Sequence, residues 1–262
     1  MPTARKRSGG ALGDNRRVTP LEQLAAALRT ADRVSVLTGA GVSAASGVPT
    51  FRGAGGLWRN YSATELASPD AFRRDPHIVW EWYAWRREQI AQCQPNAAHE
   101  VLARWTRTRP HWRVITQNVD DLHVRAGTEG LVRLHGSIFE LRCWNGCAAA
   151  SRSWRDERVP FPEMPPRCPH CGALARPGVV WFGESLDPAD VRGAEALTRC
   201  DVFIAAGTSA VVYPAAGFLH AARAEGAFTA ELNIEPTDAT STVDVAVQAP
   251  VEETLKKLDA ML

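Results

Sequence analysis

Four of the six cysteines fall into two close pairs, which is the strongest chemical signal in the sequence. The pairs are Cys143-x3-Cys147 and Cys168-x2-Cys171, with twenty residues between them. Two close pairs of thiolates can converge on one ion and complete the tetrahedral shell that Zn²⁺ prefers. Because four cysteines fill that shell, the spacing predicts a structural zinc ion with no open position for catalysis. The two remaining cysteines stand alone and are predicted to take no part in this site.

A glycine-rich turn follows a short β-branched run. Residues 33–38 lead into Gly39-Ala-Gly41-Val-Ser-Ala44, which matches G-x-G-x-x-A. In a dinucleotide-binding βα unit, the first glycine permits the turn and the second lets backbone N–H groups approach a pyrophosphate. A structural turn without a ligand is the alternative. We find no acidic residue where a dehydrogenase would hold the ribose hydroxyls, so hydride transfer is not indicated.

Polar and small residues follow three further short strands, predicted at 114–116, 202–206 and 228–232. They are Gln117, Asn118 and Asp120 after the first, Gly207, Thr208 and Ser209 after the second, and Asn233 after the third. In an open parallel sheet, ligands bind in the crevice outside the carboxyl ends of the strands. The pattern therefore predicts a binding site at one sheet edge. For residues 117–120 the alternative is an Asx-type turn without a ligand.

One histidine lies in a favourable context for proton transfer. His135 stands in Leu134-His-Gly-Ser137, where Gly136 lets the backbone approach closely. Histidine titrates near neutrality, as a general base requires. The chain has seven histidines, and any one of them is more often structural. We predict that His135 is the base, leave His123 open because it is near residues 117–120, and expect the others to be structural.

The composition is that of an ordinary soluble domain. The chain has 262 residues, 45% of them apolar, and a net charge near +1. This balance favours no specific nucleic-acid partner, and no apolar run reaches the roughly 18–20 residues that a membrane span requires. Residues 1–18 are basic and lack the apolar core of a secretory signal, so we expect a disordered tail, with organelle targeting as the alternative. The scarcity of lysine relative to arginine indicates a GC-rich bacterial genome. Without a secretory signal or a membrane span, we expect a cytoplasmic location. The oligomeric state is not indicated.

Apolar spacing predicts a helix over Leu21–Leu28, with Thr19 as its N-cap and Pro20 at the first helical position. Alternation of strands and helices predicts an α/β fold, a Rossmann-like doubly wound parallel sheet with a smaller domain. The smaller domain is made of a helical insertion at 53–92 and a zinc ribbon at 139–177. The sheet domain takes residues 19–52, 93–138 and 178–262.

Taken together, these stretches resemble the sirtuin family of NAD-dependent protein deacylases. The matches keep the family's order and span residues from about 33 to 251. They are GAGVSAASGVPTFRG at 39–53, TQNVDDLH at 116–123, LHGS at 134–137, the four cysteines, RPGVVWFGE at 176–184, GTS at 207–209 and NIE at 233–235.

The resemblance implies roles for individual residues. His135 would be the general base, with Asn118 and Asp120 beside it. NAD, the co-substrate, would be bound by Gly39, Ala40, Gly41, Ser43, Ala44, Thr50, Phe51, Arg52, Gln117, Asn118, Asp120, Gly207, Thr208, Ser209, Asn233 and Val251. An edge segment pairing with acylated-lysine peptides would be formed by Val180, Trp181, Phe182 and Gly183.

The implied reaction begins with attack of the acyl-lysine carbonyl oxygen on C1′ of the nicotinamide ribose, which releases nicotinamide. His135 then takes a proton from a ribose hydroxyl, and the products are lysine and O-acyl-ADP-ribose. Two alternatives stay open: protein mono-ADP-ribosyl transfer from the same site, and a non-catalytic module that binds NAD or acyl-lysine. The presence of His135 with Asn118 and Asp120 argues against the pure binding module.

Tyr83 and Arg86 are three residues apart in a predicted helix and therefore share one face. Arginine offers a planar fork that matches a carboxylate, and the tyrosine hydroxyl can donate another hydrogen bond. This pair resembles the sirtuin subclass that removes succinyl, malonyl or glutaryl groups. The run Gly53–Gly56 also resembles that subclass, in which the small Ala54 would widen the acyl pocket. The alternative is a solvated arginine beside a packed aromatic ring.

Overall fold

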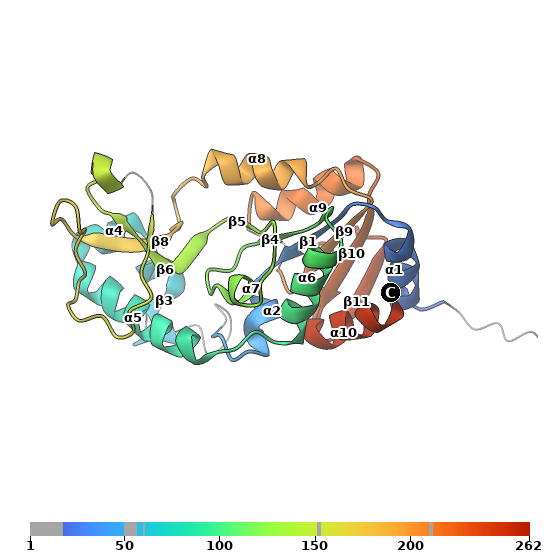
Figure 1. Ribbon diagram of the computed structural model, residues 1–262, viewed down its shortest axis with the longest axis horizontal. Coiled ribbons are helices and arrows are strands. Elements are labelled where there is room, and N and C mark those ends of the chain that lie inside the picture. The colour runs from blue at the N-terminus through green and yellow to red at the C-terminus, as the bar shows by residue number, and fades with distance from the viewer. Residues whose placement is uncertain (1–17, 50–56, 60, 151–152, 210–211) are drawn as a thin grey trace, which may run out of the picture.

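A parallel sheet of six strands, in the order β11-β10-β9-β1-β4-β5, forms the centre of the larger part of the molecule (Figure 1). The computed structural model describes residues 18–49, 57–59, 61–150, 153–209 and 212–262. The strands of this sheet are β1 (Val34–Thr38), β4 (Trp112–Thr116), β5 (Val132–Arg133), β9 (Val202–Ala206), β10 (Phe228–Asn233) and β11 (Val245–Gln248). The predicted doubly wound parallel sheet is confirmed.

Alternate residues of the central strands bury opposite faces of the sheet. Val34 and Val36 pack with helices α1, α6 and α10, whereas Leu37 and Phe203 pack with α8 and α9. Figure 1 shows α8 and α9 above the sheet, with α6 and α10 on the other side. These helices are α1 (Pro20–Thr30), α6 (Ala97–Thr108), α8 (Pro188–Ala196), α9 (Ala215–Ala224) and α10 (Val251–Met261). Strands covered on both faces explain why the β-branched runs are continuous rather than alternating.

Helix α1 begins where its sequence predicts. The Thr19 side chain accepts from the Glu22 backbone N–H, and the Glu22 carboxylate accepts from the Thr19 N–H at 2.8 Å. This capping box satisfies two of the N–H groups that a helix start otherwise leaves without partners. Pro20 occupies the first helical position, where its missing N–H costs nothing.

Two short helices, α2 (Ala40–Ala44) and α7 (Leu122–Arg125), lie beside the sheet, and a second group of elements forms what we call the small module, at the left of Figure 1. A three-stranded antiparallel sheet in the order β7-β6-β8 packs with three helices around an aromatic core that includes Phe72, Trp80 and Trp181. The helices are α3 (Ala63–Leu66), α4 (Pro69–Arg74) and α5 (Pro76–Gln92). The strands are β6 (Gly136–Cys143), β7 (Trp154–Arg155) and β8 (Ala175–Val179), and a short 3-10 helix spans Ala148–Ala150.

The insertion predicted to be helical also contains two short strands. Strands β2 (Leu57–Trp58) and β3 (Tyr61–Ser62) pair antiparallel before α3 begins. Two-residue strands carry too little periodicity to be recognised from sequence. The domain bounds proposed from the sequence stay a prediction. None of the helices in the described residues is long and apolar enough to cross a membrane.

Candidate active site

The turns that follow the parallel strands β1 and β9 lie in close contact, which is possible because both turns contain glycine. The Gly39 N–H donates to the Ala206 carbonyl at 3.1 Å, and the Gly41 N–H donates to the Gly207 carbonyl at 2.8 Å. A Cβ on Gly41 would lie 2.8 Å from Gly207 Cα, and Gly207 itself has a positive φ of +58°. The predicted approach of backbone N–H groups to a pyrophosphate at Gly41 stays a prediction. The Gly41 N–H itself donates within the protein, and the absence of a side chain allows this contact.

Side chains from three strand ends are joined at the same edge of the sheet. Gln117, after β4, donates through Nε2 to the Thr208 hydroxyl at 2.9 Å. Asn233, at the end of β10, donates through Nδ2 to the Thr208 carbonyl at 2.9 Å. Ser209 comes directly after Thr208 in the sequence. Val251 is buried at the start of α10. The predicted meeting of these strand ends is therefore present.

Asn118 ties the β4 loop to the glycine turn. Its Nδ2 donates to the Gly39 carbonyl and to the Ser43 hydroxyl, both at 3.1 Å. Ser43, fully buried on the short helix α2 (Ala40–Ala44), also hydrogen-bonds the Asp120 carboxyl. Burial raises the pKa of Asp120, although hydrogen bonds from the Leu122 N–H and Ser43 oppose this. Asp120 therefore makes the Asx-type bond to the Leu122 N–H that the alternative predicted, and Asn118 and Asp120 are also tied to the glycine turn and Ser43.

His135 is oriented as a base should be. Its Nδ1 lies 2.8 Å from the Gln117 carbonyl, an acceptor, so Nδ1 carries the proton and Nε2 keeps its lone pair. Burial lowers the pKa of His135, and the bond to Gln117 opposes that shift. Gly136 follows with a φ of +77°, and a Cβ there would lie 2.2 Å from the Gly178 carbonyl oxygen. Only glycine allows β6 to leave His135 this close to β8.

Two buried histidines lie behind the site. His99 Nε2 is 3.3 Å from the Ser43 hydroxyl, and His123 Nε2 is 3.0 Å from the Thr38 hydroxyl. The two rings pack against each other with centroids 4.8 Å apart and planes tilted by 58°. Burial lowers the pKa of His99 to about 4 and that of His123 well below its usual value, so both are neutral at pH 7. The sequence leaves the role of His123 open and predicts a structural role for His99. The position of His99 as the third residue of α6, after the Asn96 cap, is the sequence feature that indicates this role.

The predicted acyl-binding pair lies on α5 with both side chains buried. The Tyr83 hydroxyl accepts the Trp181 indole N–H at 3.0 Å. The Arg86 guanidinium lies 5.3 Å from the centroid of the Trp82 ring and interacts electrostatically with Tyr83 and Asp120. Arg86 is 6% exposed, which rules out the alternative of a solvated arginine. The pair therefore faces the same interior region as the Asp120 carboxyl.

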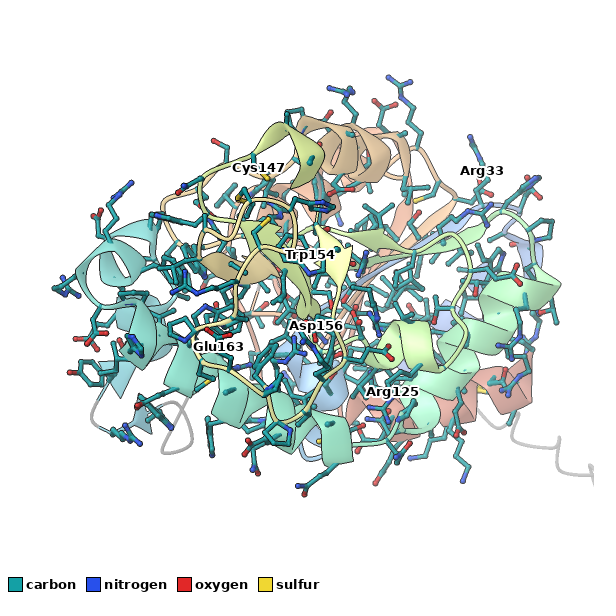
Figure 2. The ribbon with its side chains drawn as sticks, turned by 60° about the vertical axis from the view of Figure 1, so that its left-hand side comes forward. Arg33, Arg125, Cys147, Trp154, Asp156 and Glu163 are labelled. Atoms are coloured by element: carbon teal, nitrogen blue, oxygen red, sulfur yellow. The ribbon has the colours of Figure 1, made fainter. Side chains whose placement is uncertain are left out.

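The four cysteines of the two pairs come together at the end of the small module. Their Sγ atoms all lie within 4.8 Å of one another, with Cys143 and Cys171 at 3.5 Å and Cys147 and Cys168 at 3.8 Å. Tetrahedral zinc–thiolate bonds place neighbouring sulfurs roughly 3.8 Å apart, so the set fits one Zn²⁺ ion. Figure 2 shows Cys147 on this module above Trp154 and Asp156.

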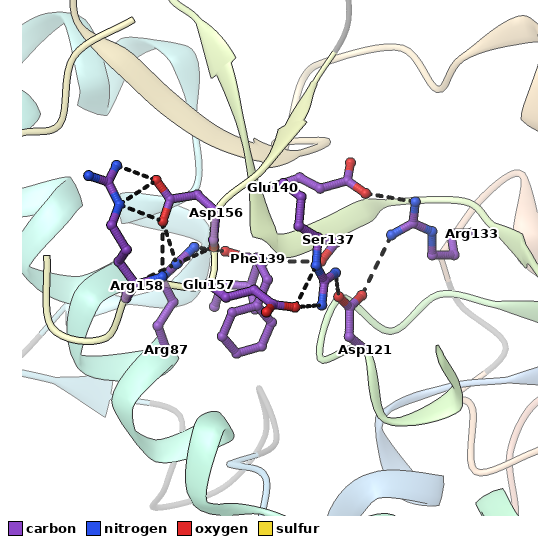
Figure 3. Close-up of polar contacts among 11 residues, drawn as sticks. Arg87, Asp121, Arg133, Ser137, Phe139, Glu140, Asp156, Glu157 and Arg158 are labelled. Atoms are coloured by element: carbon purple, nitrogen blue, oxygen red, sulfur yellow. Dashed lines mark hydrogen bonds and ion pairs between the residues drawn. The ribbon is translucent and has the colours of Figure 1, made fainter. Parts of the chain in front are cut away.

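An ion-pair cluster that the sequence did not reveal joins the site loop to the small module (Figure 3). Asp121, in the left-handed region with φ 61°, is buried and pairs with Arg155 of β7. Its other oxygen lies 3.6 Å from Arg133, which also donates to Glu140 of β6 at 2.8 Å. Because Asp121 directly follows Asp120, these contacts fix the loop that carries the site carboxyl.

Not every predicted site residue is placed as expected. The segment Val180–Gly183 follows β8 as a turn, and the N–H groups of Val180, Trp181 and Phe182 all donate within the chain. The Trp181 side chain points into the core of the small module, whereas Phe182 is half exposed. Peptide pairing by this segment stays a prediction. Four predicted residues lie outside the described residues: Thr50, Phe51, Arg52 and Ala54.

Comparison with known proteins identifies a family and relatives that this chain resembles. A sequence model of the Sir2 family matches residues 39–214. The NAD-dependent protein deacylase of Aquifex aeolicus is 46% identical over 86% of this chain and 93% of its own length. The dog protein named NAD-dependent protein deacylase sirtuin-5, mitochondrial, is 44% identical over 86% of this chain and 80% of its own length.

Solved structures agree with this assignment. The crystal structure of a Sir2 homolog in complex with NAD superposes with a TM-score of 0.85 at 42% identity, covering 97% of this chain and 95% of its own. A Sir2 homolog bound to 2′-O-acetyl ADP ribose gives the same TM-score over 91% of this chain and 95% of its own. The family model, the relatives and the solved structures agree, and the chain belongs to the Sir2 family.

Proposed function

We propose that this protein removes acyl groups from protein lysine with consumption of NAD, and that it prefers acyl groups ending in a carboxylate. The observation that carries the reaction is the position of His135, whose Nδ1–H is fixed on the Gln117 carbonyl at 2.8 Å. Asn118 and Asp120 are held beside this histidine through Ser43 and the glycine turn. A binding module would not need a base with a fixed tautomer.

The strand-end residues fit a dinucleotide. Gly39, Gly41 and Gly207 have no side chains, so the turns after β1 and β9 pack closely at this edge, where a Cβ would meet other protein atoms at 2.5–2.9 Å. Gln117, Thr208 and Asn233 present polar groups along the same edge. NAD, when bound, supplies an anomeric carbon that is electrophilic once nicotinamide departs.

The chain's own residues then have separate tasks. Asn118 and the buried Asp120 present polar groups next to Ser43 and the glycine turn, where they could contact the nicotinamide ribose. His135 Nε2 accepts a proton from a hydroxyl of the substrate ribose, which the lowered pKa permits because the ring is neutral at pH 7. Protonation of this ring at lower pH removes the acceptor.

The acidic-acyl preference rests on Tyr83 and Arg86. Both side chains are buried, both can donate hydrogen bonds, and the Arg86 guanidinium is positively charged and interacts electrostatically with Asp120. An acyl chain ending in a carboxylate could accept charge-assisted hydrogen bonds from this pair, whereas acetyl has no carboxylate to offer.

The division into two domains and the compartment rest on the sequence alone. We propose that residues 53–92 and 139–177 form the smaller domain and that the protein acts in the cytoplasm on acylated-lysine segments of other proteins. Limited proteolysis and cell fractionation would test these two proposals.

A peptide panel tests the proposed function. One peptide carrying acetyl-, malonyl-, succinyl- or glutaryl-lysine is incubated with and without NAD, and the products are identified by mass spectrometry. We expect O-acyl-ADP-ribose, with kcat/KM highest for an acidic acyl group. ADP-ribosylated protein with intact acyl-lysine would support transferase activity instead.

The variant Arg86→Met tests the acyl preference. Losing a charge-assisted contact to a buried carboxylate should lower desuccinylation by roughly 10²-fold relative to deacetylation. Arg199→Met, at an exposed arginine, is the matched control and should change neither rate. Equal loss of both activities in Arg86→Met would count against the assignment.

A further inference from the structure

The hydrogen bond between Trp181 and Tyr83 joins two segments that are far apart in sequence. Trp181 follows β8, and its indole Nε1 lies 3.0 Å from the Tyr83 hydroxyl on α5. Both side chains are buried, at 2% and 3% exposure. Among the described residues, Trp181 is the hydrogen-bond partner of this hydroxyl.

The indole is held firmly in place. The Arg176 guanidinium stacks on the Trp181 ring, 3.5 Å from its centroid, and Phe72 packs with the ring centroids 5.4 Å apart. The Glu184 carboxylate pairs with Arg176 and also accepts the Trp181 backbone N–H at 2.8 Å. The direction of the indole N–H is therefore fixed by contacts on its ring and on its backbone.

A fixed donor determines what the Tyr83 hydroxyl can do. An indole N–H only donates, so Tyr83 must accept in this bond, and its own proton must point away from Trp181. Burial raises the pKa of Tyr83 far above its usual range, and the hydroxyl keeps that proton at every physiological pH. Its neighbour Arg86 also only donates.

We propose that Trp181 is a specificity-determining positioning residue: it fixes the Tyr83 hydroxyl as a donor to the acyl chain. The inference rests on the proposed function, because it assumes that Tyr83 and Arg86 meet the end of the acyl group. If the Tyr83 hydroxyl and the Arg86 guanidinium both donate to the end of the acyl group, they favour an end group that only accepts hydrogen bonds, which is a carboxylate. They disfavour a carboxamide of the same size, whose NH₂ needs an acceptor.

The test compares two substrates of equal size on one peptide, succinyl-lysine and its terminal carboxamide, succinamyl-lysine. The measured quantity is the ratio of kcat/KM for carboxylate over carboxamide. Trp181→Phe removes the N–H, which frees the Tyr83 hydroxyl to accept, and should lower this ratio roughly tenfold. Any change in peptide affinity cancels, because both substrates share the peptide.

The Tyr83→Phe background is the control that distinguishes orientation of the hydroxyl from a merely structural role of Trp181. In the Tyr83→Phe background there is no hydroxyl to orient, so adding Trp181→Phe should leave the ratio unchanged. A second replacement at position 181, β-(3-benzothienyl)alanine, keeps the shape of the indole but lacks the N–H, and should match Trp181→Phe. It provides the measurement if Trp181→Phe folds poorly.

The outcomes separate the inference from the proposed function. A ratio that stays at the wild-type value in both position-181 variants would overturn the inference, as would an equal fall in the presence and absence of Tyr83. A wild-type enzyme that processes acetyl-lysine faster than every acidic acyl-lysine would overturn the acidic-acyl preference itself, whatever the variants do.

Discussion

Acidification should destabilise this protein through the buried histidine behind its site. His99 is fully buried against Ser43 and Asn96, and burial lowers its pKa from 6.5 to about 4. In the unfolded chain the His99 imidazole is therefore protonated below about pH 6.5, whereas in the folded protein it is protonated only near pH 4. The stabilising contribution is complete above pH 6.5 and is lost as the pH falls toward 4.

The size of the effect follows from those two values. Between pH 7.5 and pH 5.0, preferential protonation of the unfolded state at His99 alone lowers the free energy of unfolding by about 2 kcal/mol. The ring of His123 packs against His99, and burial together with that neighbour lowers the pKa of His123, so it adds to the loss.

Urea unfolding followed by tryptophan fluorescence at the two pH values measures this difference. In His99→Gln, which cannot titrate, the loss between pH 7.5 and 5.0 should be smaller by about 2 kcal/mol than in the wild type. Each protein is compared with itself at pH 7.5, which removes any cost of the substitution to the α6 cap. An identical pH dependence in both proteins would refute the assignment of His99 as a neutral buried group.

Three further predictions concern the site and its supports. His135→Tyr should abolish turnover while the melting temperature stays near that of the wild type. Because the pKa of His135 is lowered, the acid limb of the wild-type kcat/KM profile should have its midpoint below pH 6.5. A midpoint above pH 6.5 would argue against His135 as the base. Asp121→Asn keeps a residue that tolerates positive φ but removes the charge, and should lower the free energy of unfolding by about 1–2 kcal/mol in urea, a value discounted because Arg133 and Arg155 are partly exposed. Removal of zinc with a chelator should unfold the small module and abolish activity, and added Zn²⁺ should restore the far-UV signal; an unchanged signal in metal-free protein would contradict a structural zinc site.

Short-range patterns predicted much of this molecule. Thr19 and Pro20 marked the start of α1, and the β-branched runs before Gly39, Gln117 and Gly207 marked the strands of the sheet. The rule that parallel strands end at a common edge then placed the polar residues together. The cysteine spacing likewise predicted a cluster that the structure forms.

Features that depend on tertiary contact were not accessible in this way. The ion pair of Asp121 with Arg155 joins residues that are 34 positions apart, and no local pattern signals the left-handed conformation of this aspartate. The hydrogen bond of the Gly41 N–H to the Gly207 carbonyl likewise joins two distant strand ends. Trp181 stays a predicted part of a peptide-binding edge, but the burial of its side chain beside Arg176 and Tyr83 could not be read from the sequence.

The central claim is that an acylated lysine and NAD react beside His135, and one incubation tests it most directly. Purified zinc-loaded protein is mixed with a succinyl-lysine peptide and NAD, and nicotinamide, free lysine peptide and O-succinyl-ADP-ribose are quantified together. We expect the three products in equal amounts from the wild type and none from His135→Tyr. Folded wild-type protein that leaves both peptide and NAD intact, with acetyl-lysine as well as with succinyl-lysine, would contradict the account.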